Sequence, residues 1–138
     1  MNKVKINLIL VNLFFLIFFN NILNAESNFY IVTKVDNEII TNIDIVQEAN
    51  YLIALNNDLE KIDKKSLVSL ARDSLIREKI KRIEIIKNEA SLTVKDELLE
   101  GIIQNYYKKL KLNSLNEFKN YLARYNLKLK DVKEKLKI

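Results

Sequence analysis

The chain has 138 residues, of which 49% are hydrophobic and 30% charged, and it carries a formal net charge of +5. This length suits one domain, and the composition is that of a globular protein. The chain contains no His and no Cys. These absences exclude Ser-His-Asp and Cys-His catalysis, zinc sites with nitrogen or sulfur ligands, and disulfides. With a single glycine, Gly101, a glycine-rich phosphate loop is excluded as well, so we expect no catalytic residue, no metal and no cofactor.

The first 25 residues have the basic, apolar and polar order of a secretory signal peptide. Two lysines precede an apolar run over residues 6–19, and the polar stretch NNILNA ends at Ala25. We expect cleavage between Ala25 and Glu26, which would make the protein an exported one. Because Leu23 is larger than the residue usual at its position before a cleavage site, two alternatives stay open. They are an uncleaved N-terminal membrane anchor and a buried core helix.

Residues 29–41 predict a β-hairpin. Residues 29–35 favour a strand through the β-branched residues Ile31, Val32, Thr33 and Val35, and the strand pattern resumes over residues 38–41. The pair Asp36 and Asn37 between them suits a two-residue turn, because both residue types tolerate left-handed backbone angles. Two strands alone are not stable in water, so we expect the hairpin to pack on helices.

Two helices follow, each with apolar residues at helical spacing. The first is expected to begin with Asn42 as its N-cap and to end near Asn56. The second is expected to run from Ser66 to about Asn88, after a polar loop. The apolar stripes comprise Ile45, Val46, Ala49, Leu52 and Ile53 in the first helix, and Leu67, Leu70, Ala71, Leu75, Ile80, Ile83 and Ile86 in the second.

Three further helices are predicted in the last third of the chain. Thr93 with Asp96, and Ser114 with Glu117, have the spacing of capping boxes at the start of the first two. The three apolar stripes comprise Val94, Leu98, Leu99, Ile102, Ile103, Tyr106 and Leu110, then Leu115, Phe118, Tyr121, Leu122 and Tyr125, then Leu129, Val132 and Leu136. The chain stops at Ile138 inside the last pattern, so we expect a domain that is incomplete at its C-terminal end or cut from a longer protein.

Two groups of carboxylates were weighed as sites. Asp96, Glu97 and Glu100 share one helical turn, and such a cluster can bind a hard cation. First-turn acids that complement the helix dipole explain it more simply. Asp44 and Glu48 are spaced four apart on the first helix, and we expect both to lie on the solvated surface.

The aromatic residues are the stronger candidates for binding. Tyr106, Tyr107, Phe118 and Tyr121 would suit contact with varied apolar peptides. Tyr106, Phe118, Tyr121 and Tyr125 also fall on predicted core stripes, where packing is the competing interpretation. Tyr107 lies off the stripe and is the better surface candidate.

Basic charge gathers toward the C-terminal end. From Gln104 onward the chain has ten Lys or Arg residues and three acids. This excess is typical of a solvated lysine-rich face, and an anionic membrane surface is the alternative. Export argues against nucleic acid as a partner.

The run VTKVDNEIITNIDI, residues 32–45, resembles the start of the N-terminal domain of SurA-type periplasmic chaperones. In that family a short strand, an Asn-rich turn and a second strand lead into the first helix. The following run from SLVSLARDSLIREK onward is similar to the family's later helices. The matching positions there include Leu75, Ile76, Glu78, Ala90, Val94, Asp96, Leu99, Ile102, Leu115, Phe118, Leu122 and Tyr125.

The resemblance covers nearly all of residues 30–138 and implies a mainly α fold, with an N-terminal two-stranded hairpin and about five helices. This is the SurA N-terminal, or trigger-factor/SurA peptide-binding-like, fold. The family usually continues into parvulin-type prolyl isomerase domains and closes with a returning C-terminal helix. Neither is found in this sequence, so isomerase activity is not expected of this chain.

By the same resemblance, we expect a periplasmic, ATP-independent chaperone module. It would bind unfolded outer-membrane or other exported polypeptides through an apolar groove, and its incomplete domain would allow a homodimer. Two alternatives stay open. The chain could be the N-terminal fragment of a parvulin-type isomerase whose catalytic domain is missing, or a membrane-anchored helical adaptor that places its basic C-terminal helix on lipid headgroups.

Overall fold

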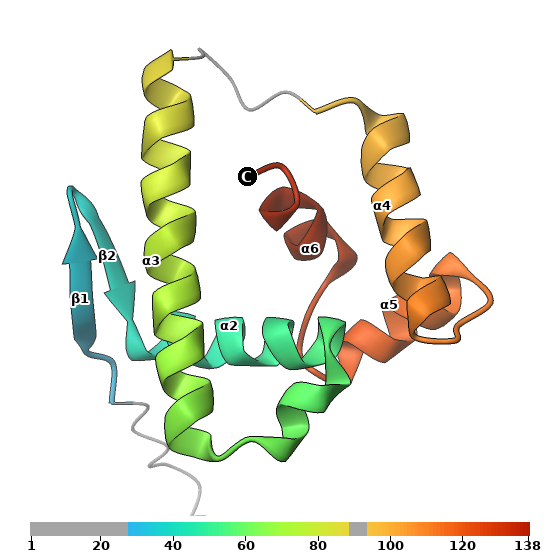
Figure 1. Ribbon diagram of the computed structural model, residues 1–138, viewed down its shortest axis with the longest axis horizontal. Coiled ribbons are helices and arrows are strands. Elements are labelled where there is room, and N and C mark those ends of the chain that lie inside the picture. Colours follow the sequence, from blue (N-terminus) through green and yellow to red (C-terminus); the bar gives the residue numbers. More distant parts are fainter. Residues whose placement is uncertain (1–27, 89–93) are drawn as a thin grey trace, which may run out of the picture.

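The computed structural model of the protein describes residues 28–88 and 94–138. The fold is mainly helical with one small antiparallel sheet, and it confirms a hairpin followed by five helices (Figure 1). The expected signal peptide, its cleavage site at Ala25 and Glu26, and Thr93 lie outside the described residues. The N-cap of α4 is Lys95, which makes no side-chain capping bond, so the capping box expected from Thr93 and Asp96 is wrong. The elements are β1 (Ile31–Val35), β2 (Glu38–Thr41), α2 (Asn42–Leu55), the 3-10 helix η1 (Asn57–Lys61), α3 (Lys64–Asn88), α4 (Asp96–Lys109), α5 (Leu115–Ala123) and α6 (Leu129–Lys135).

The hairpin forms as predicted and lies beside α3 (Figure 1). Val35 pairs with Glu38 across the turn, and a bulge interrupts the register between Ile31 and Thr33. Of the two turn residues only Asp36 has a positive φ, 54°. This is the pattern of a type II′ turn, in which the first central residue alone is left-handed.

The start of α2 corrects the predicted N-cap by one residue. Thr41, not Asn42, caps the helix, because the Thr41 hydroxyl accepts from the Asp44 N–H at 3.2 Å. The Asp44 carboxylate in turn accepts from the Thr41 N–H at 2.8 Å, which completes a capping box. The Asn42 side chain instead accepts from the Tyr30 N–H and donates to the Asn28 carbonyl. Asn42 therefore ties the chain before β1 to the first turn of α2.

The first core lies between the hairpin, α2 and α3. Its buried members are Ile40, Ile45, Ala49, Ala71 and Leu75. The predicted stripes are partly wrong here. Val46 is 60% exposed, because the buried arc of α2 runs through Glu48 instead. Ile80 and Ile86 are also about half exposed. At Ile80 this is so although α3 still runs beside the hairpin, since the adjacent Lys79 contacts Glu38 of β2.

The second core gathers the end of α2 with α4, α5 and α6. Its buried members are Ala54, Ile103, Phe118, Leu122 and Val132. Ser114 caps α5 as predicted, but the Glu117 carboxylate accepts from the Asn113 N–H and not from that of Ser114. Leu98 and Leu115, which were predicted to face the core, are largely exposed. α4 and α5 therefore share a narrower contact than their wide apolar stripes suggest.

Two helices end without the glycine that normally closes them. Lys111 and Asn126 take left-handed φ angles of 59° and 56°. At the end of α4, the Leu112 N–H donates to the Tyr107 carbonyl at 2.8 Å and the Lys111 N–H to the Lys108 carbonyl at 2.9 Å. This is the Schellman arrangement, and the same pair of bonds closes α5 around Asn126. The chain thus makes its tight helix ends from Lys and Asn.

We predict that Phe118→Ala lowers the free energy of unfolding by about 3–5 kcal/mol, as for other large core truncations. The reason is that Phe118 is fully buried at the centre of the second core. Denaturant unfolding followed by circular dichroism measures the change. Leu115→Ala, one turn away and 41% exposed, is the control and should cost less than about 1 kcal/mol. Equal losses in the two variants would contradict this assignment of the core.

Candidate functional site

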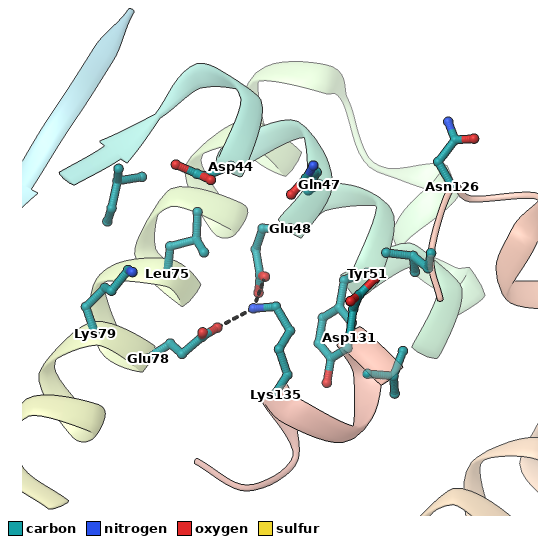
Figure 2. Close-up of a pocket in the computed structure, with 13 residues that line it drawn as sticks. Asp44, Gln47, Glu48, Tyr51, Leu75, Glu78, Lys79, Asn126, Asp131 and Lys135 are labelled. Carbon is teal, nitrogen blue, oxygen red and sulfur yellow. Dashed lines mark hydrogen bonds and ion pairs between the residues drawn. The ribbon is translucent and has the colours of Figure 1, made fainter. Parts of the chain in front are cut away.

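α2, α3 and α6 meet around a cleft of about 250 Å³ (Figure 2). Glu48 of α2 is 2% exposed, and its Oε2 lies 2.6 Å from Lys135 Nζ of α6. Lys135 also donates to the Glu78 carboxylate of α3. Ser74 Oγ donates to Glu48 Oε1 at 2.7 Å. We call Glu48, Glu78 and Lys135 the ionic triad; it joins three helices through one ammonium group.

The triad corrects the expectation that Glu48 lies on the solvated surface. A buried carboxylate is costly unless it is paired and hydrogen-bonded. The Lys135 contact to Glu48 Oε2 is an ion pair and not an aligned hydrogen bond, so Ser74 makes the well-directed bond to this side chain. Asp44 is also drawn from solvent, since its carboxylate serves the capping box.

The environment of the cleft changes the pKa of two of its side chains, Lys135 and Tyr51. Burial alone lowers the pKa of Lys135, but the carboxylates of Glu48 and Glu78 outweigh it, so the pKa is raised. The Lys135 ammonium also lies 5.0 Å from the centroid of the Tyr51 ring, within cation–π range. Burial, with smaller contributions from neighbouring groups, raises the pKa of Tyr51. At neutral pH Lys135 is therefore charged and Tyr51 protonated, and in these states neither side chain is a nucleophile or a base.

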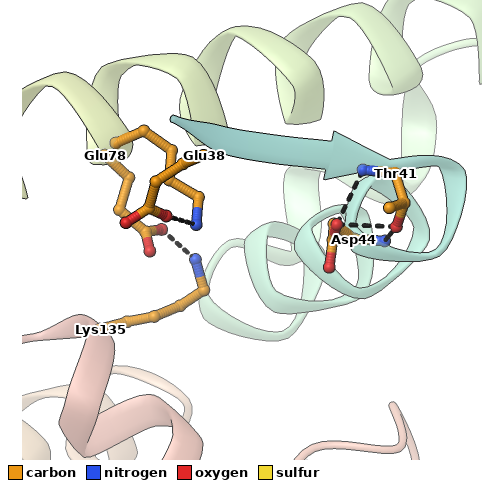
Figure 3. A network of polar contacts seen from close by, with 6 residues as sticks. Glu38, Thr41, Asp44, Glu78 and Lys135 are labelled. Carbon is orange, nitrogen blue, oxygen red and sulfur yellow. Dashed lines mark hydrogen bonds and ion pairs between the residues drawn. The ribbon is translucent and has the colours of Figure 1, made fainter. Parts of the chain in front are cut away.

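A second ionic contact fixes the hairpin to α3. Lys79 of α3 donates to the Glu38 carboxylate of β2, close to the Lys135–Glu78 pair (Figure 3). The hydrogen bond from Lys79 lowers the pKa of Glu38. The hairpin, α2 and α6 are therefore all attached to one stretch of α3, and the cleft is a structural joint.

Some of the aromatic residues predicted to bind peptides are buried in the second core, and others lie at the surface or line a groove. Phe118 is a core residue with no exposed surface, which removes it from any binding face. Tyr106 is half-buried against the second core. Tyr121 Oη lies 2.9 Å from the Ala54 carbonyl and 2.7 Å from Asn57 Oδ1, and Tyr125 Oη donates to Glu60 at 2.9 Å. Tyr121 and Tyr125 thus fasten α5 to the end of α2 and to η1.

Tyr107, the predicted surface candidate, lines an open groove of about 510 Å³ along α4. Ile103 and Leu115 contribute apolar lining, and Gly101 lies at its surface with no atom within 4 Å of the position of an added Cβ. The remaining lining residues are Glu97, Glu100, Gln104 and Lys133. The groove is mixed in character, with an apolar patch between charged ends.

A run of exposed apolar residues lies elsewhere, at the hairpin. Because Asn42 binds Asn28 and Tyr30, the residues before β1 lie next to the first turns of α2. We call this region the hairpin surface; its exposed members are Phe29, Tyr30, Ile31, Val32, Ile43 and Val46. Within residues 28–88 and 94–138, β1 pairs only with β2, so the other edge of β1 has no strand partner in that part of the chain. The sequence does not predict the hairpin surface. Strand and helix patterns identify apolar faces, but they do not show whether another element covers such a face.

Two further findings bound the chemistry of the described residues. No helix within residues 28–88 and 94–138 is long and apolar enough to cross a membrane. Nor does that part of the chain bring together three carboxylates that could hold a metal ion. Asp96, Glu97 and Glu100 instead lie in and just after the first turn of α4, where negative charge favours the helix dipole.

We predict that Lys135→Met lowers the free energy of unfolding by about 2 kcal/mol or more, because it leaves Glu48 buried without a counter-charge. The loss should be smaller than for a fully buried pair, since a quarter of the Lys135 side chain is exposed. Lys137→Met removes only the pair with Glu134, whose side chain is 58% exposed, and should leave the free energy of unfolding nearly unchanged. The double variant Glu48→Met with Lys135→Met should recover most of the loss. Denaturant unfolding that ranks the variants otherwise would refute the role of the triad.

A second prediction concerns alkaline pH. A lysine whose folded-state pKa is raised contributes stability that is fully present below its unfolded value, 10.5, and is lost as the pH rises through the folded value. The raised pKa of Tyr51 acts in the same direction. We expect the free energy of unfolding to fall above about pH 10.5, and to fall less steeply in Lys135→Met. Urea unfolding at a series of alkaline pH values measures both slopes. Equal slopes would show that Lys135 does not contribute.

Comparison with known proteins assigns no family to this arrangement. No protein-family model, curated protein or solved structure matches the chain. The hairpin with its free edge, the joint on α3 and the groove on α4 are therefore the observations on which a function can be based.

Proposed function

We propose that the protein is an ATP-independent chaperone module that binds unfolded exported polypeptides, outer-membrane proteins among them, through the hairpin surface. The observation that carries this proposal is the gathering of exposed apolar side chains at Phe29–Val32 and on the first turns of α2. Contiguous exposed apolar side chains in a soluble domain mark interaction sites. The resemblance to SurA-type N-terminal domains supports the same interpretation of the fold. The signal-like first 25 residues support a periplasmic location.

The hairpin would bind clients in two ways. Its apolar side chains would cover exposed apolar segments of an unfolded chain, and each contact would be weak enough to release. The unpaired edge of β1 would accept an extended client segment through backbone hydrogen bonds, which need no particular sequence. Such binding requires neither ATP nor covalent chemistry.

The joint on α3 would give this surface a rigid support. Glu38 of β2 is held by Lys79, and Ile40 of β2 is fully buried in the first core. Asn42 holds the chain on the other side of β1. The exposed face of the hairpin is therefore presented without the conformational freedom of an isolated two-stranded ribbon, which lowers the entropy lost on binding.

We expect the double variant Phe29→Ser with Ile31→Ser to bind an unfolded outer-membrane β-barrel protein at least about tenfold more weakly, because two half-exposed apolar side chains are lost. The assay is suppression of light scattering when the barrel protein is diluted from urea. Both residues are more than half exposed, so the thermal unfolding midpoint should change little.

The matched control is Ile80→Ser with Ile86→Ser, two exposed isoleucines on the last turns of α3. It should suppress aggregation as the unmodified protein does. If the unmodified protein fails to suppress aggregation, the chaperone proposal is wrong. If the control loses as much as the hairpin variant, binding is not located at the hairpin surface.

A further inference from the structure

The only glycine of the chain occupies a position that the fold itself does not require to be glycine. Gly101 lies in the interior of α4, where glycine is unfavourable relative to alanine. It has no left-handed φ, and an added Cβ would meet nothing within 4 Å. A glycine on an open helix face permits close approach of another backbone. That face belongs to the groove of about 510 Å³.

The charges along this face of α4 are ordered. Glu97, Gly101, Gln104 and Lys108 follow one another at spacings of three or four residues and so lie on the same side of the helix. The acid is at the N-terminal end, Gly101 near the middle and the lysine at the C-terminal end. Within the described chain neither Glu97 nor Lys108 forms an ion pair. Two copies of this face therefore have complementary charges when one copy is rotated by 180°, so that the two helices run antiparallel.

From these observations we infer that this face of α4 docks against the same face of a second copy of the chain, with the two helices antiparallel and crossing near Gly101. In this arrangement Glu97 of each copy lies over Lys108 of the other. A two-fold axis makes the contact isologous and closed, so it stops at a dimer. The dipoles of the two α4 helices run in opposite directions in this arrangement, which is electrostatically favourable.

The apolar side chains near the crossing supply the contact area. Leu115 of α5 is 41% exposed, and it lines the groove together with Tyr107 of α4. Burial of such side chains would give the association its affinity, and the charge pairs would fix its direction. The docking does not require that the hairpin surface binds clients, because that surface lies on other elements.

Charge reversal tests the inference. Glu97→Lys and Lys108→Glu should each weaken the dimer at least about tenfold, because each places like charges together at both ends of the crossing. The double variant Glu97→Lys with Lys108→Glu restores opposite charges and should dimerise like the unmodified chain. An equimolar mixture of the two single variants should also dimerise. Sedimentation velocity measures each case over a range of protein concentrations. The sample is the soluble form of the protein that accumulates when the full chain is expressed.

Gly101→Leu supplies an independent test. The added side chain has open space in the single copy, so the thermal unfolding midpoint should not fall, whereas the dimer should be lost. Asn120→Leu, at an exposed position of α5, is the matched control and should leave the dimer intact. An unmodified chain that sediments as a monomer up to about 1 mM would overturn the inference. So would a dimer that survives Gly101→Leu and both single charge reversals.

Discussion

One buried carboxylate organises the structure. Glu48 lies in the middle of α2 where its neighbours form the first core, and a charge in that position is tolerated only with compensation. Ser74 on α3 and Lys135 on α6 provide it. Two elements that are far apart in sequence are thereby brought to the same side of α2. We infer that Glu48 helps to specify how the helices are arranged, because a buried carboxylate requires particular partners. An apolar side chain at the same place would pack against many neighbours and would not fix the position of any of them.

α2 also connects the two cores, and this explains how a chain with two separate cores holds one shape. Its first half carries Ile45 and Ala49 of the first core, and Ala54 near its end belongs to the second. Tyr121 binds the last turn of the same helix through the Ala54 carbonyl. The hairpin at one end and α5 at the other are thus both attached to a single rigid helix. A binding surface at the hairpin and a docking face on α4 would keep a fixed separation.

The sequence predicts where the helices and strands lie along the chain far better than it predicts which of their faces are buried. Turn chemistry at Asp36 and Asn37, capping at Ser114 and Glu117, and apolar periodicity placed the hairpin and all five helices. Those signals are local. Whether Val46 or Glu48 is buried depends on which side chains of α3 and α6 pack against α2. The α2 sequence alone does not show that Lys135 will lie next to Glu48. The same reason applies to Ile80 and Ile86, because the α3 sequence does not show which of its faces another element covers.

The distance along the chain between Glu48 and Lys135 has a consequence for biosynthesis. A polypeptide that leaves a ribosome or a translocation pore from its N-terminus presents Glu48 long before the amine that neutralises it. Until α6 emerges, closing the first core around α2 would desolvate an unpaired carboxylate. Partly synthesised chains, or chains clipped within α6, would therefore stay loosely packed and accessible to proteases. We therefore expect chains that contain α6 to resist proteolysis better than chains that lack it, because only the former supply the counter-charge of Glu48.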